Sequence, residues 1–123
     1  MIRKPNLDVL CIIFALLITL PVSAMSFSVG NLQYNTIGDG NSVEVNGYKN
    51  QPTDIIIPST VNYAGKNYIV EGIGSSAFYG CYTLTSVTLG DNINSIGYQA
   101  FKGCIAFTDI HTSADNATFL SLD

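Results

Sequence analysis

The chain has 123 residues, a net charge of −4, and only 5 Lys and Arg residues in total. So few cations exclude the basic surface that recognition of nucleic acid or of an anionic membrane requires. The length suits one small domain, and its polar residues, mainly Ser, Thr, Asn and Tyr, are typical of a β-rich secreted protein.

Residues 1–24 have the organisation of a secretory signal peptide. Arg3 and Lys4 precede an apolar run over 9–20, and small residues occupy the two positions that a signal peptidase reads before its cut after Ala24. A transmembrane anchor is the alternative, but this run has 12 residues, whereas a membrane-spanning helix needs about 20. We therefore expect a cleaved leader and a protein that is secreted or held at the cell surface, with no membrane span in the mature chain.

Residues 25–52 are predicted to form an N-terminal β-hairpin. Apolar residues alternate along FSVGNLQY, which starts at Phe27, and along SVEVNGY, which starts at Ser42, with the turn signal GDGN between them. We expect this hairpin to act as a cap, because the first coil of a stacked array has no neighbour to bury it. The Asp-Gly pair of the turn also occurs in calcium loops, but a plain turn is its commoner setting.

A short buried strand from Ile55 to Ile57 follows and is stopped by Pro58. The run VNYAGKNYIV then predicts a second hairpin, which turns at Ala64 and Gly65. No run up to this point has helical periodicity.

The next segment is written twice. IGSSAFYGC at 73–81 returns as IGYQAFKGC at 96–104, 23 residues later, with six of the nine letters identical. A fixed period in the twenties is typical of stacked coils, and the runs LTSVTL and FTDIHT that follow the two copies have the strand spacing of a leucine-rich repeat. We expect Val87 and Ile110 to be buried neighbours in adjacent parallel strands.

The repeated phrase is predicted to form the corner of each coil. It is too short for a full helix, so we expect one helical or 3₁₀ turn between Gly97 and Gly103. Ala100 lets the backbone come close, and Phe101 fills the core, where it stacks on Phe78 of the preceding coil.

The pattern IGxxAFxGCxxLTxVxL and the preceding IIIPSTVNYAGKNYIVEGIG resemble the BspA-like leucine-rich repeat family over residues 27–123. Members are secreted or surface proteins of host-associated anaerobic bacteria and of some mucosal protozoa. The resemblance implies a right-handed, β-rich leucine-rich-repeat solenoid over 53–123, with short parallel strands and helical or 3₁₀ turns at its corners, behind the hairpin cap. It also implies a role in adhesion or in binding host proteins.

The last residues depart from this period. IHTSADNATFLSLD resembles another repeat type of the same family, with Asn116, Phe119, Ser121 and Asp123 at its characteristic positions. In the family that phrase continues into a further strand, so we expect about two and a half coils here and a chain truncated from a longer protein. Asn116 also begins an acceptor sequence for N-glycosylation, which matters only if the source is eukaryotic.

A binding module is the leading hypothesis, with its partner on the exposed strand face. The outward positions of successive strands form two columns: Asp54, Ser86 and Asp109 in one, and Ile56, Thr88 and His111 in the other. Repetition makes such faces broad and rigid, and the expected partner is a protein, with a host matrix or cell-surface protein as the candidate. Each residue is alternatively an ordinary solvated position. The whole segment is alternatively a structural cap and spacer, or the non-catalytic appendage of a longer secreted enzyme.

Neither catalysis nor a cofactor is expected. Ser86, Asp109 and His111 suggest a triad, but an exposed strand face supplies no oxyanion hole and does not exclude water. Asp109 and His111 offer two metal ligands, where a closed site needs about four. No glycine-rich stretch carries the lysine and the helix of a phosphate-binding loop.

Cys81 and Cys104 occupy the same place in successive corners. In a secreted chain such a pair suggests a disulfide, but stacked residues hold their Cβ atoms farther apart than the ~3.8 Å that a disulfide prefers. We therefore expect two buried free thiols that behave as small hydrophobic residues.

Overall fold

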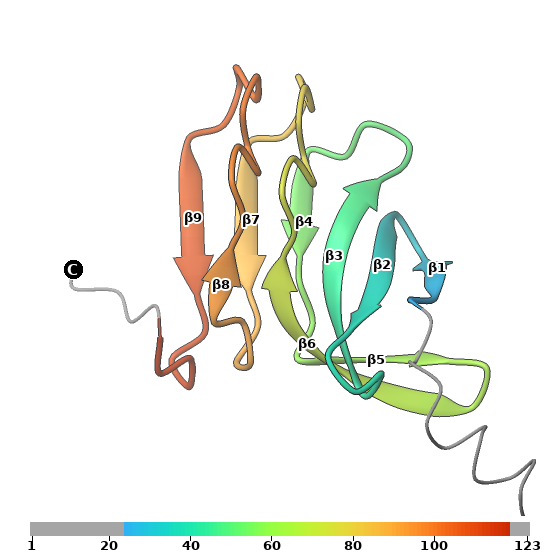
Figure 1. The fold of residues 1–123 in the computed structure, drawn as a ribbon. Coiled ribbons are helices and arrows are strands. Elements are labelled where there is room, and N and C mark those ends of the chain that lie inside the picture. Colours follow the sequence, from blue (N-terminus) through green and yellow to red (C-terminus); the bar gives the residue numbers. More distant parts are fainter. Residues whose placement is uncertain (1–23, 119–123) are drawn as a thin grey trace, which may run out of the picture.

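The computed structural model describes residues 24–118, and in this range the chain is built from strands and turns (Figure 1). The strands are β1 (Ser26–Val29), β2 (Leu32–Ile37), β3 (Ser42–Tyr48), β4 (Asp54–Ile56), β5 (Thr60–Tyr63), β6 (Lys66–Ile73), β7 (Ser86–Leu89), β8 (Ser95–Ile96) and β9 (Asp109–Thr112). No residue between 24 and 118 lies in a helix, and this part of the chain accordingly holds no helix that could cross a membrane. The predicted leader, apart from Ala24, lies outside the described residues.

One sheet has six strands in the order β1-β2-β3-β6-β5, with β8 also paired to β6. The expected two-stranded hairpin cap is not confirmed in that form. Residues 26–48 hold three antiparallel strands, and the third, β3, also pairs in parallel with β6. The extra turn lies between the paired residues Val29 and Leu32. Gly30 adopts a φ of 60° there, a left-handed conformation that glycine reaches without strain.

Two turns that the sequence predicts are confirmed. β5 and β6 are antiparallel and turn through Ala64 and Gly65, whose φ values are 53° and 82°. In the GDGN turn between β2 and β3, the carboxylate of Asp39 accepts hydrogen bonds from the amide nitrogen of Asn41 at 3.0 Å and from its Nδ2 at 2.9 Å. These bonds lower the pKa of Asp39, because they favour its charged form.

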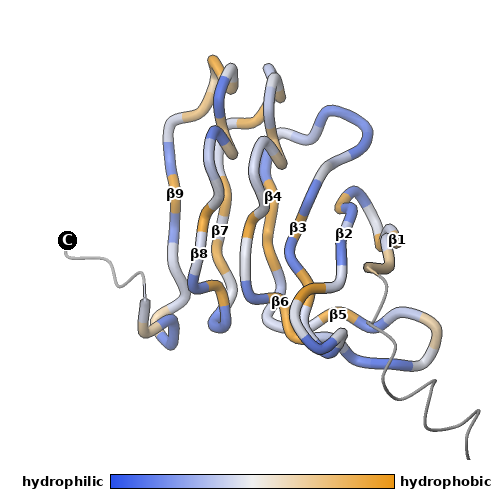
Figure 2. The backbone as a smooth tube through the Cα atoms, viewed as in Figure 1, coloured by the Kyte–Doolittle hydropathy of each residue, from blue (hydrophilic) through white to orange (hydrophobic). Residues whose placement is uncertain are grey.

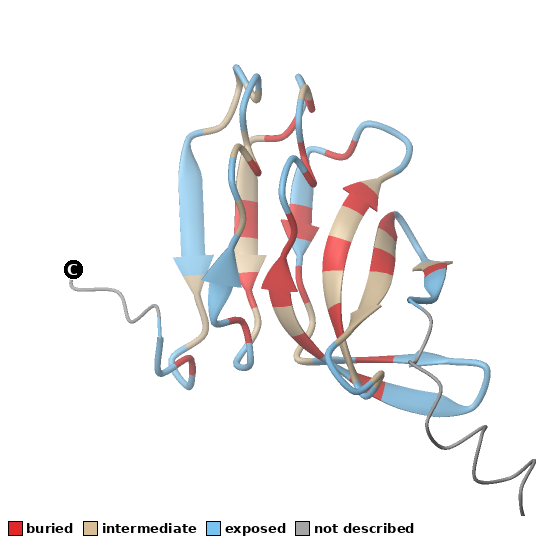
Figure 3. Cartoon of the chain, in the orientation of Figure 1, coloured by how far each residue is buried: buried red, intermediate tan, exposed pale blue. Residues whose placement is uncertain are grey.

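The second sheet is parallel and has the order β4-β7-β9. Val87 pairs with Ile55 on one side and with Ile110 on the other, as predicted. Val87 is fully buried, but Ile110 is 48% exposed, so the predicted burial of Ile110 is wrong. Figure 3 shows the cause, since β7 has a neighbouring strand on each side whereas β9 is an edge strand of the described sheet and exposed along most of its length.

The core lies between the two sheets. Ile55 and Val87 of the parallel sheet belong to the same buried cluster as Val45 and Val70 of the six-stranded sheet. Figure 2 shows hydrophobic residues along β4 and β7, and buried positions alternate with more exposed ones along both strands. Burying one such side chain is worth about 1.5–3 kcal/mol, so this packing fixes which residues of the parallel sheet remain at the surface.

The predicted helical or 3₁₀ turns at the corners are not confirmed, and the structure has successive turns there. The amides of residues 77, 79 and 81 donate to carbonyls three residues earlier, as in successive turns. The amides between them donate to backbone carbonyls of the next coil: Ser76 to Tyr98 at 2.9 Å, Phe78 to Ala100 at 2.8 Å and Gly80 to Lys102 at 2.8 Å. A helix uses its amides within one segment, whereas here every second amide joins neighbouring coils.

The aromatic stack at the corners is confirmed. The rings of Phe78 and Phe101 lie 5.4 Å apart and are parallel to within 2°. Phe101 also stacks on Phe107, with 4.9 Å between the ring centres. Gly97 allows the corners to approach this closely, because a Cβ at that position would lie 2.5 Å from the backbone nitrogen of Ser75.

Cys81 and Cys104 are free thiols in the structure, as expected. Cys81 is buried and Cys104 is half-buried. Each Sγ lies near a carbonyl of the preceding coil: 3.8 Å from that of Pro52 for Cys81 and 3.0 Å from that of Phe78 for Cys104. Burial raises the pKa of the Cys104 thiol, because desolvation disfavours the thiolate.

Asn116 lies near the end of the described residues. Its side chain is fully buried, and its Nδ2 donates to the carbonyls of Gly90 at 2.7 Å and Ile93 at 3.0 Å. The amide nitrogen to which a glycan would attach is therefore buried and hydrogen-bonded in the folded chain. The other residues that carry the resemblance at this end, Phe119, Ser121 and Asp123, lie outside the described residues.

Candidate binding face

The parallel sheet of β4, β7 and β9 carries all the candidate binding residues on its outer side. The strand register forms two rows across the sheet: Asp54–Ser86–Asp109 and Ile56–Thr88–His111. Ser86 and Thr88 are half-buried, and the other four side chains are exposed. We call these two rows the candidate face. Its apolar member, Ile56, is 74% exposed.

The carboxylate of Asp54 is held in place by hydroxyl groups. Ser86 Oγ donates to Asp54 Oδ1 at 2.7 Å, and Thr85 Oγ1 donates to the same oxygen at 3.2 Å. Thr53 Oγ1 donates to Asp54 Oδ2 at 3.4 Å. The hydrogen bonds from Ser86 and then Thr85 hold the pKa of Asp54 below its ordinary value, because they stabilise the charged form. Asp54 therefore presents a fixed negative charge to solvent.

A ladder of threonines runs beside this row. Thr85 Oγ1 lies 3.0 Å from the carbonyl of Thr53, and Thr108 Oγ1 lies 3.2 Å from the carbonyl of Thr85. Each hydroxyl shares its one proton between this carbonyl and an aspartate carboxylate, that of Asp54 or Asp109. The amides of Thr85 and Thr108 donate to the same two carbonyls, at 2.7 Å and 2.9 Å. The ladder ties the three strands together where they begin. It was not predicted, although the sequence carries a signal for it, since Thr precedes the outward Asp or Ser in each strand.

Asp109 and His111 lie on the edge strand β9. Thr108 Oγ1 donates to Asp109 Oδ2 at 3.1 Å, whereas Asp54 on β4 also receives a hydrogen bond from the adjacent strand. The three strands of the candidate face have the sequences DII, SVTL and DIHT, which contain no Lys or Arg. The carboxylates of Asp54 and Asp109 therefore have no cation on their own strands.

The geometry does not assemble a catalytic triad. Ser86 Oγ donates to Asp54, and the residue in register with His111 is Thr88. A serine nucleophile needs a base within hydrogen-bond reach of its own hydroxyl, and here that hydroxyl is committed to a carboxylate on the other side. Between residues 24 and 118, no three His, Cys, Asp or Glu side chains are grouped so that they could hold a metal ion. The face offers charge, hydrogen-bonding groups and one exposed aliphatic side chain.

A model of a known protein family matches most of the described chain. The family model described as "BspA type Leucine rich repeat region (6 copies)" matches residues 48–121. No curated protein matches the chain.

Solved structures of leucine-rich repeat proteins are similar in fold. A leucine-rich repeat protein from Bacteroides capillosus has 29% identity and a TM-score of 0.64, over 72% of this chain and 65% of that one. A leucine rich cell surface protein from Faecalibacterium prausnitzii has 28% identity and a TM-score of 0.66, over 76% of this chain and 25% of that one. The leucine-rich repeat protein of T. pallidum has 25% identity and a TM-score of 0.61, over 74% and 41%. This chain spans less than two thirds of the length of each of these proteins.

Proposed function

This chain belongs to the BspA-type leucine-rich repeat family, and we propose that it is a binding module that docks a protein partner on the candidate face. Leucine-rich repeat modules generally act in protein interactions, and repeat arrays present extended rigid surfaces to their partners. No enzyme family is among the matches described above. The proposed module therefore works by recognition.

The observation that carries this proposal is the fixed geometry of the candidate face. Asp54 is held by Ser86 and Thr85 from the neighbouring strand, and the threonine ladder ties the strands below it. Side chains that are already ordered lose little conformational entropy when a partner binds. The face is thus organised before any partner arrives.

The chemistry of the face favours a partner with basic groups. Asp54 and Asp109 flank Ser86 in one row, and the whole chain has a net charge of −4. A Lys or Arg of the partner would find complementary carboxylates there. Ile56, which is 74% exposed, would serve as an apolar contact at the end of the second row.

We further propose that the module works outside the cell, in adhesion to a host matrix or cell-surface protein. Two observations support this location: the leader-like residues 1–24, and the similarity to a protein described as a leucine rich cell surface protein. One observation supports the alternative role, a cap and spacer within a longer array: the match covers only 25% of that cell surface protein.

The test measures binding of the chain to immobilised basement-membrane extract and to fixed epithelial cells. Ile56→Ala, and separately Asp109→Asn combined with His111→Gln, should each weaken binding by about fivefold or more, as expected for contacts within an interface. Ile105→Ala is the matched control, because Ile105 is also an exposed isoleucine (82%) but lies outside the candidate face. Circular dichroism checks that every variant keeps its fold.

If binding survives both changes on the face but is lost in Ile105→Ala, the binding site lies at the corners and the candidate face is not the site. Binding to neither probe by the unaltered chain would favour the spacer role.

A further inference from the structure

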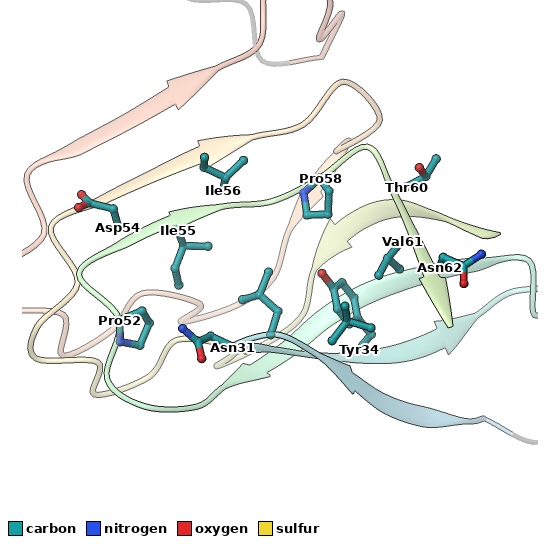
Figure 4. Close-up of a pocket in the computed structure, with 12 residues that line it drawn as sticks. Asn31, Tyr34, Pro52, Asp54, Ile55, Ile56, Pro58, Thr60, Val61 and Asn62 are labelled. Carbon is teal, nitrogen blue, oxygen red and sulfur yellow. The ribbon is translucent and has the colours of Figure 1, made fainter. Parts of the chain in front are cut away.

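A groove runs along the outer edge of β4, the edge that faces away from β7. Its volume is about 550 Å³, within the range of ~300–1,000 Å³ that is typical of ligand sites. Buried apolar side chains contribute to its lining: Leu32 and Tyr34 from β2, Ile55 from β4 and Val61 from β5. Figure 4 shows Ile55 turned into this space, whereas Asp54 projects from the opposite side of β4.

Between residues 24 and 118, no strand pairs with β4 along this groove. The amide of Ile57 donates to the carbonyl of Thr88 at 2.8 Å, and the carbonyl of Thr53 accepts from Ser86 of β7 at 3.3 Å. Successive residues of a strand direct their N–H and C=O groups to opposite sides, so those of Asp54 and Ile56 point away from β7. Since β4 is an edge strand with β7 as its one neighbour in the sheet, these groups face the groove.

We propose that this groove binds an extended segment of a partner protein, which adds as a further strand to the outer edge of β4. Strand edges pair with extended polypeptides because their donors and acceptors have the same spacing. Every second side chain of the added strand would point toward the apolar lining. The site is distinct from the candidate face, because the face uses the side chains of Asp54 and Ile56 and the groove uses their backbone.

The surroundings of the groove define the chemistry of that segment. Asp54 is the one charged residue among those that line it. Its side chain projects to the outer side of β4 (Figure 4), so a Lys or Arg at an outward-pointing position of the added strand is complementary. Leu32, Ile55 and Val61 line it with buried apolar side chains, which favours apolar residues at the alternate, inward-pointing positions of the segment. β4 has 3 residues, so the paired stretch is short.

The test uses the full chain, residues 1–123, labelled with ¹⁵N and ¹³C. The probe is the synthetic peptide Lys-Val-Thr-Val-Thr-Val-Lys, which carries a cation at either end and so serves both strand directions. We expect its addition to shift the amide signals of Asp54 and Ile56 and the methyl signals of Ile55 and Val61. The same peptide with N-methyl groups on residues 2 to 6, the three valines and both threonines, loses the donors that either strand direction would use along that edge, and it should bind about tenfold more weakly.

A pair of variants tests the role of the β4 edge. Ile56→Pro removes an amide that points into the groove and has no partner among residues 24–118, so the fold should persist while peptide affinity falls about tenfold. Ile56→Val keeps that amide and should bind like the unaltered chain. Thr112→Pro is the matched control, since residue 112 lies on the outer edge of β9, at the opposite side of the same sheet, and it should leave binding unchanged.

Three results would overturn the proposal. One is peptide-induced shifts confined to β7 and β9, with none at Ile55 or Val61, and another is equal binding by the N-methylated peptide. The third is the finding, from nuclear Overhauser contacts without peptide, that residues 1–23 of the chain itself fill the groove. If Ile56→Pro unfolds the chain, the N-methylated peptide and the pattern of shifted residues still decide the question. A failure here leaves the binding function of the candidate face untouched, because that function is tested with Asp109, His111 and matrix proteins.

Discussion

The two copies of the repeated phrase, 73–81 and 96–104, share most of their sequence but have different surroundings. Phe78 and Cys81 in the first copy are fully buried, whereas Phe101 and Cys104 in the second are half-buried. The two corners nevertheless have the same pattern of turn hydrogen bonds three residues apart. The phrase therefore dictates the conformation of a corner, and the neighbouring coils dictate how far it is buried.

The hydrogen bonds between coils show the same difference. The alternate amides of the first corner donate to carbonyls of the second. The corresponding amides of the second corner, at residues 99, 101 and 103, have no backbone acceptor between residues 24 and 118. Stability in a stacked array is shared between each coil and its neighbours, so equivalent residues in the two copies should contribute unequally to the free energy of unfolding.

The largest expected effect comes from the aromatic stack. Phe78→Ala should lower the free energy of unfolding by about 3–5 kcal/mol, because it leaves a cavity among fully buried neighbours. Phe101→Ala should cost about 2 kcal/mol, since that ring is partly solvated before the change. Urea unfolding followed by circular dichroism measures both values. Tyr98→Ala, at a position that is 76% exposed, is the control and should stay within about 0.5 kcal/mol. Equal losses for the two phenylalanines would mean that Phe101 is covered in solution.

A smaller effect is expected at Asn116, which lies 23 residues after the buried Ile93. Asn116→Ala leaves the carbonyls of Gly90 and Ile93 without the donor that Nδ2 supplies, and an unsatisfied buried polar group costs about 1–3 kcal/mol. Asn92→Ala is the matched control, because Asn92 Nδ2 also donates to a carbonyl, that of Ser59 at 3.1 Å, but at the surface. A loss at residue 116 no greater than at residue 92 would contradict the structural role of this amide.

Much of the repeat geometry could be predicted because it follows from the period. A spacing of 23 residues places Phe101 over Phe78 and Ile110 beside Val87. The corner conformation could not be predicted in the same way. Whether the amide of Phe78 continues a helix depends on an acceptor in another coil, the carbonyl of Ala100, and local sequence does not specify a contact of that range.

The candidate face could be predicted from the sequence, whereas the groove could not. Alternation along each strand, with the register of the repeat, was enough to place Ser86 between Asp54 and Asp109. The groove depends on β2, β4 and β5 meeting at one edge, and the sequence carries no period that links these strands. The turn at Gly30, which positions β2, was also missed, because the alternation on either side of it reads as one strand.

The smallest expected effect concerns the two acidic residues of the candidate face. Asp54 receives a hydrogen bond from Ser86 on the adjacent strand, whereas the hydroxyl donor at Asp109 is its own neighbour, Thr108. The hydrogen bond from Ser86, and after it the one from Thr85, holds the pKa of Asp54 below its ordinary value of 3.8. A carboxyl group with a lowered pKa in the folded state stabilises the fold above its ordinary pKa, and that contribution is lost as the pH falls through the folded value.

Ser86→Ala should therefore raise the pKa of Asp54 toward 3.8 and remove part of the loss of stability that occurs below about pH 4. Titration of the Asp54 side-chain carboxyl carbon by NMR measures the pKa, and acid unfolding of the same variant measures the stability. Thr108→Ala is the control, because its hydroxyl contacts Asp109 and the Thr85 carbonyl but not Asp54, and it should leave the titration of Asp54 unchanged. An equal shift in both variants would show that the general field of the sheet, and not the hydroxyl of the adjacent strand, sets the charge of Asp54.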